Sequence, residues 1–125
     1  MRDALLQQAR NIVYSLCQFG SKDFWKWGEE VNGNLRRITG DITDTWESLY
    51  KNGFSQDKAA PYANPGRWND PVMLIVGMVG WGENLHPTRL KPRKQYTHLS
   101  LWSLLSATLL IGCDLSKLMY LPLTF

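Results

Sequence analysis

Short apolar runs alternate with amphipathic segments along the 125 residues. The apolar runs have strand length and carry few charges, as do strands that are buried on both faces of a parallel sheet. The amphipathic segments have helical spacing or begin with residues that cap helices. We expect strands at 11–17, 35–42, 68–79 and 110–114. We expect helices at 3–10, 22–31, 45–52 and 95–109, and a further short element from residue 116.

Two helix starts are predicted from capping residues. Ser21 precedes the 22–31 segment, and Asp44 precedes the 45–52 segment with Glu47 three residues later, as in a capping box. In the last helix, Leu99, Trp102, Leu105 and Leu109 are expected on one apolar face.

The resulting order α, β, α, β, α, β, α, β predicts an α/β fold with parallel strands and right-handed crossovers. Four strands cannot close a barrel, so the chain is either an open doubly wound sheet or half of a (β/α)8 barrel. No GxGxxG or GxxxxGKS loop is present, which argues against a nucleotide-binding sheet.

Composition and charge exclude several partners. The net charge is +3, but the Lys and Arg residues are scattered, apart from a short run at 91–94 that we interpret as a solvated loop. A nucleic-acid partner is therefore not expected. The longest apolar run is too short to span a bilayer, and the two cysteines have no metal-ligand spacing. We expect no metal, no cofactor and no membrane contact, and the oligomeric state is left open.

In parallel α/β folds, reactive groups gather at the carboxyl ends of the strands. The acids expected at these ends are Asp41, Asp70 and Asp114, with Arg37 nearby. Carboxylates perform the acid, base and nucleophilic steps of glycoside hydrolysis. The six tryptophans fit a sugar pocket as well as a packed core.

Five segments strongly resemble consecutive strand-end motifs of glycoside hydrolase family 27, whose commonest members are α-galactosidases. They are YSLCQFG (14–20), NLRRITGDITDTW (34–46), PGRWNDPVMLIVG (65–77), QYTHLSLW (95–102) and LLIGCDL (109–115). The resemblance runs from about residue 3 to 118 and implies the fifth to eighth strand-helix units of a (β/α)8 barrel. Residues 1–125 would then be a partial catalytic domain without its N-terminal half. Residues 53–71 and 80–90 look most like bacterial members.

The resemblance implies a role for seven residues. Asp41 matches the general acid/base and Arg37 the arginine that binds sugar hydroxyls. The other pocket residues that it implies are Cys17, Gln18, Phe19, Asp70 and Met73. Positions four apart on a strand face the same way, so Arg37 and Asp41 are expected to lie together.

The chain departs from the family pattern at several positions. Gln18-Phe19 stands where Glu-Trp is usual, Arg36 replaces a Trp, and Val72 replaces the second Asp of WNDPDM. The family's nucleophile belongs to a KxD motif on the fourth strand, and that segment is absent from these residues.

The implied activity is release of terminal α-linked galactose with retention of configuration, from a carbohydrate substrate. The chain by itself is expected to be inactive because it lacks the nucleophile. If the parent protein is like its bacterial relatives, it would be secreted or periplasmic. Two alternatives stay open: a related glycosidase for β-L-arabinopyranosides, α-N-acetylgalactosaminides or isomaltodextran, or an inactive sugar-binding remnant.

Overall fold

The computed structural model describes residues 1–117. Its α-helices are α1 (Arg2–Leu6), α2 (Trp46–Phe54) and α3 (Pro92–Leu104). Its strands are β1 (Ser15–Cys17), β2 (Leu35–Arg37), β3 (Trp68–Asp70), β4 (Met78–Val79) and β5 (His86–Pro87). Four 3-10 helices complete this part of the chain: η1 (Ser21–Lys26), η2 (Ala60–Tyr62), η3 (Gly82–Asn84) and η4 (Leu115–Lys117). The element predicted from residue 116 onward lies mostly outside the described residues.

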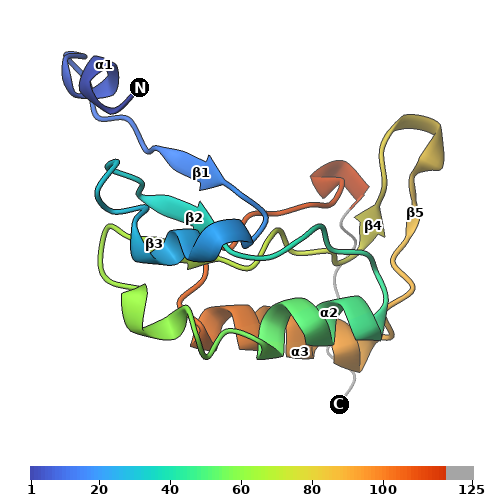
Figure 1. Cartoon of the computed structure of the whole chain (residues 1–125). Helices are drawn as coiled ribbons and strands as arrows, with labels where there is room; N and C mark the ends of the chain where they lie inside the picture. The colour runs from blue at the N-terminus through green and yellow to red at the C-terminus, as the bar shows by residue number, and fades with distance from the viewer. Residues whose placement is uncertain (118–125) are drawn as a thin grey trace.

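Strands β1, β2 and β3 form a parallel sheet in chain order. The fourth predicted strand, 110–114, is reduced to one parallel bridge between Leu74 and Ile111. Strands β4 and β5 pair separately as an antiparallel hairpin, which stands apart from the sheet in Figure 1. The α/β class with parallel strands is therefore confirmed, and the hairpin was not predicted.

The predicted strand at 68–79 was wrong in extent. Only residues 68–70 pair with β2. Two residues later, Val72 has φ 83°, a left-handed backbone that a β-branched residue rarely adopts. This turn takes the following apolar residues out of the sheet and into the core. Leu74 and Ile75 are buried there without forming a strand of their own.

Each of the four predicted helices overlaps a helical segment, three of them an α-helix and one a 3-10 helix, but none has the predicted bounds. The 22–31 segment is the short 3-10 helix η1, capped by Gly20, with left-handed backbone at Lys22 and Asp23. The N-cap of α2 is Thr45, whose hydroxyl accepts from the Ser48 amide at 3.3 Å, and not Asp44. Helix α3 begins at a proline, a residue favoured in the first turn, and it ends before Leu109.

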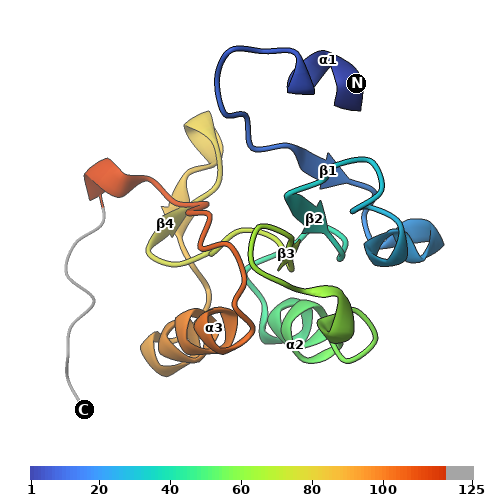
Figure 2. The same cartoon turned by 90° about the vertical axis from the view of Figure 1, so that its left-hand side faces the viewer.

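Helices α2 and α3 lie side by side on one side of the strands (Figures 1 and 2). A Cβ at Gly53 would lie 2.5 Å from a methyl group of Leu101, so this glycine allows the two helices to approach closely. The fully buried Trp102 centres the main core and donates from Nε1 to the Val72 carbonyl at 2.7 Å. His98 is also fully buried, with its ring centroid 4.1 Å from that of Trp102 in an edge-on arrangement.

Arg36 braces β2, the central strand of the sheet. Its buried guanidinium donates to the backbone carbonyls of Trp25, Tyr62 and Arg67, at 2.8, 2.5 and 3.0 Å. A Cβ at Gly28 would lie 2.7 Å from the Arg36 side chain, so that glycine leaves room for it. This departure from the family pattern therefore has a structural role: it ties η1, η2 and the loop before β3 to β2.

Candidate active site

Three of the predicted site residues form one row across the sheet. Cys17 ends β1, Arg37 ends β2 and Asp70 ends β3, and each is the register partner of the next. Register partners on parallel strands project to the same face. The row therefore places a thiol, a guanidinium and a carboxylate together at the carboxyl edge of the sheet, where α/β enzymes hold their reactive groups.

Arg37 connects this row to the loop after β2. Its Nη2 donates to Oδ1 of Asp41 at 2.5 Å, and its Cζ lies 5.1 Å from the centroid of the Phe19 ring. The Arg37 side chain is 16% exposed, whereas that of Asp41 is 81% exposed. The shielded guanidinium of Arg37 thus holds a carboxylate that is open to solvent. A side chain that donates a proton to a substrate needs such access.

Asp70 is buried, and its Oδ1 accepts from the Val72 amide at 2.8 Å. Burial raises the pKa of this carboxyl, while the Val72 amide and the positive charge of Arg37 act in the opposite direction. Asp70 thus shapes the turn after β3 and adds negative charge beside Arg37.

Asp41 borders a groove of about 460 Å³ that Met73 also lines. The strained Val72 and the exposed Trp81 belong to the same groove. A Cβ at Gly112 would collide with the Met73 sulfur, so this glycine fixes where the methionine side chain lies. Asp41 and Met73, which are 32 positions apart in the sequence, therefore border one groove.

Cys17, Gln18 and Phe19 are all exposed, and none of them lines this groove. Of the three, Phe19 contacts another predicted site residue through its ring, and Cys17 does so through strand register. For Gln18 the structure gives a backbone contact, in which its carbonyl accepts from the Ser21 amide at 2.8 Å.

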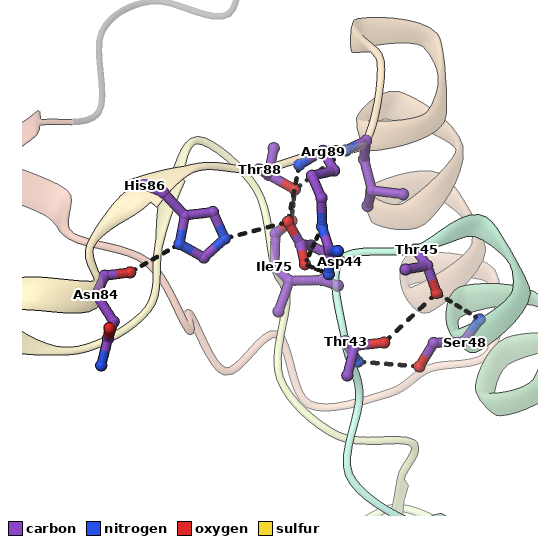
Figure 3. A network of polar contacts seen from close by, with 10 residues as sticks. Thr43, Asp44, Thr45, Ser48, Ile75, Asn84, His86, Thr88 and Arg89 are labelled. Carbon is purple, nitrogen blue, oxygen red and sulfur yellow. Dashed lines mark hydrogen bonds and ion pairs between the residues drawn. The ribbon is translucent and has the colours of Figure 1, made fainter.

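The sequence reasoning missed a polar cluster directly beside the groove. Asp44 is buried and binds Arg89 in a forked contact: Oδ1 accepts from Nη2 at 2.5 Å and from Nε at 3.0 Å. His86 approaches from the hairpin, with Nε2 3.4 Å from the other Asp44 oxygen (Figure 3). The Arg89 guanidinium holds the pKa of Asp44 well below its usual range.

This cluster ties the loop that follows Asp41 to the β4–β5 hairpin. The sequence predicts Asp44 as a helix cap, because an acid before a helix usually caps it. Nothing local distinguishes Arg89, 45 positions away, as its partner.

Within residues 1–117, no group of three or more His, Cys, Asp or Glu residues could hold a metal ion. A search of the same residues found no helix long and apolar enough to cross a membrane.

Comparison with known proteins shows which family the chain resembles. A family model described as alpha galactosidase A matches residues 1–121. Alpha-galactosidase 2 of Arabidopsis thaliana is 42% identical over 118 residues, and alpha-galactosidase A of Cellvibrio japonicus is 31% identical over 129 residues. Each alignment covers 94% of this chain but only 27% and 29% of the relative.

Among solved structures, a family 27 β-L-arabinopyranosidase from Geobacillus stearothermophilus superimposes with a TM-score of 0.87 at 29% identity. That match covers 96% of this chain and 29% of the enzyme. The chain thus spans little more than a quarter of the length of the relatives it matches. From the family match and the identity to α-galactosidases, the chain belongs to the α-galactosidase family of glycoside hydrolases, family 27.

Proposed function

We propose that this chain supplies the acid/base half of the catalytic barrel of a retaining α-galactosidase. Residues 1–125 would form the fifth to eighth strand-helix units, with affinity to bacterial members of the family. One observation carries the proposal: Asp41, open to solvent at the groove, is held by Arg37 in the row of strand ends.

In this proposal Asp41, protonated, gives its proton to the glycosidic oxygen as the bond to the leaving group breaks. A carboxylate from outside this chain attacks the anomeric carbon and forms a glycosyl-enzyme. Asp41, now ionised, then takes a proton from the water that hydrolyses this intermediate. The carbohydrate is the substrate, and no cofactor takes part in these steps.

Arg37 is suited to exchange partners during binding. Among the described residues its Nη2 reaches Asp41, but its buried Nε has no partner. A sugar hydroxyl that accepts from Nη2 would compete with Asp41 for this N–H group and loosen the hold on Asp41. Asp70 would keep the guanidinium anchored at the strand end. Cys17, Phe19 and Met73 would line the sugar site, and Gln18 would lie at its rim.

A segment exchange tests the proposal. Residues 3–117 replace the matching stretch of Arabidopsis thaliana alpha-galactosidase 2, which supplies the rest of the barrel. We expect this completed enzyme to hydrolyse an aryl α-galactoside, and the 125-residue chain alone to have no turnover. An inactive but folded chimera, beside an active parent enzyme, would reject the proposed function.

A second activity is favoured by the structural match to the arabinopyranosidase. β-L-Arabinopyranose has the ring stereochemistry of α-D-galactopyranose but lacks the hydroxymethyl group at C5. Assaying the completed enzyme with matched aryl α-galactoside and aryl β-L-arabinopyranoside decides between the two sugars. A higher kcat/KM for the arabinoside would reassign the specificity without changing the role of Asp41.

A further inference from the structure

Trp81 differs from the other tryptophans of the chain in its exposure. All six lie within the described residues, and five are buried or half-buried, whereas Trp81 is 79% exposed. It stands in the loop between β4 and β5, and this loop forms the projecting end of the hairpin (Figure 1). An exposed indole can offer its apolar face to a partner.

The indole borders two neighbouring grooves. One contains Asp41, Val72 and Met73, and the other contains Cys113 and Asp114, which follow the bridge at Ile111. Trp81 therefore lines the same groove as the carboxylate that we assign as the proton donor.

The loop that carries Trp81 is held in place. Gly80 has φ 96°, and a Cβ there would collide with the Asn84 carbonyl oxygen. The Asn84 amide in turn donates to the Trp81 carbonyl at 3.0 Å, which closes the turn.

His86 links this loop to the acid/base segment. Its Nδ1 lies 2.7 Å from the Asn84 carbonyl oxygen and its Nε2 faces Asp44, three residues after Asp41 (Figure 3). A braced loop keeps the aromatic platform at a fixed distance from the acid, at little entropic cost on binding.

We propose that Trp81 stacks against a sugar ring of the leaving group. This inference rests on the proposed function and assigns the residue that would contact the aglycone where the aglycone is itself a sugar. A general acid protonates the leaving oxygen, so the groove beside Asp41 lies on the leaving-group side. An indole face there matches the apolar C–H face of a pyranose.

Binding to the 125-residue chain gives a test that needs no catalysis. Melibiose, at millimolar concentration, should shift the indole N–H signal of Trp81 in a ¹⁵N-labelled sample. The indole signals of Trp27 and Trp68, which lie away from both grooves, should stay in place. If the Trp81 signal does not move more than these two, the inference is overturned.

Kinetics of the completed enzyme give the second test. Trp81→Ala should lower kcat/KM for melibiose about tenfold, the loss expected for one stacking contact. The same substitution should change kcat/KM for α-galactosyl fluoride by less than about twofold, since fluoride offers no ring to stack on the indole. Trp81→Phe should recover most of the lost kcat/KM. Phe54 is an exposed aromatic residue on α2, and Phe54→Ala should leave kcat/KM for both substrates unchanged.

Provided that the completed enzyme is active, the inference is overturned if Trp81→Ala lowers kcat/KM equally for both substrates. It is also overturned if this variant does not lower kcat/KM for melibiose. An enzyme inactive even on the fluoride would instead reject the proposed function, and the indole signal of the chain would still decide the role of Trp81.

Discussion

Arg37 holds Asp41 although the two residues do not share a strand. Strand β2 ends at Arg37, and Asp41 lies in the loop that follows, yet Nη2 and Oδ1 are 2.5 Å apart. The Ile38 amide still donates to the Asp70 carbonyl at 3.0 Å, so the chain leaves the sheet only after this residue. Asp41 thus has the exposure of a loop residue and is held by a residue of the sheet.

Asp41→Asn in the completed enzyme should separate substrates by their leaving groups. Melibiose needs the proton, so its glycosylation step should slow about 10²–10⁴-fold. An activated aryl galactoside leaves as a stable phenolate and should slow less. A glycosyl-enzyme should then accumulate, because the water that hydrolyses it lacks a base. Azide, which needs no base, should restore turnover of the aryl substrate and give the retained galactosyl azide.

Asp57→Asn is the matched control, since it makes the same chemical change at an exposed carboxylate in another loop. It should leave both substrates unchanged. Equal slowing of both substrates by Asp41→Asn, with no response to azide, would make Asp41 a binding residue and remove it from the acid/base role.

Arg37→Lys should act on both substrates alike. Lysine keeps the charge but loses the planar fork that can hold Asp41 and a sugar hydroxyl together. We expect kcat/KM to fall by a similar factor, about tenfold, for melibiose and for the aryl galactoside. Measuring both values on one preparation checks this. A loss confined to melibiose would show that Arg37 acts on the leaving group.

The sequence was sufficient for the parallel strands because apolar runs of strand length recur between helical segments. It also placed Arg37 with Asp41, although for a reason that the structure revises, since a loop and not a strand brings them together. The Asp44–Arg89 contact could not be predicted, because it joins residues 45 positions apart and neither has a local signature. The left-handed Val72 was equally hidden, since valine is a strong strand former that here follows a proline.

Arg36→Met should destabilise the protein. The substitution leaves the carbonyls of Trp25, Tyr62 and Arg67 without their shared donor. We expect a loss of about 2–4 kcal/mol in the free energy of unfolding, measured with urea. Arg67→Met is the control, because its side chain pairs with Glu29 at the surface and should cost less than about 1 kcal/mol. Similar losses for both variants would contradict the bracing role of Arg36.

His98 should make stability fall as the pH is lowered. Burial lowers the pKa of this histidine to about 4, from an ordinary value of 6.5, and neither ring nitrogen has a partner among the described residues. Above pH 6.5 the ring is neutral in both the folded and the unfolded chain. Between 6.5 and 4 the unfolded chain binds the proton first, so the free energy of unfolding decreases by about 3 kcal/mol in total.

Two carboxyls near the core titrate differently and must be separated from this effect. The lowered pKa of Asp44 removes stability only below the ordinary range of an aspartate, whereas the raised pKa of Asp70 adds stability as the pH falls. Both contributions remain in His98→Leu, which cannot take up the proton.

Urea unfolding of the original protein and of His98→Leu at a series of pH values therefore isolates the contribution of the histidine. Their difference in unfolding free energy should change between pH 6.5 and 4 and be constant above this range. A difference that is independent of pH would show that the ring of His98 reaches solvent or a partner in the folded protein.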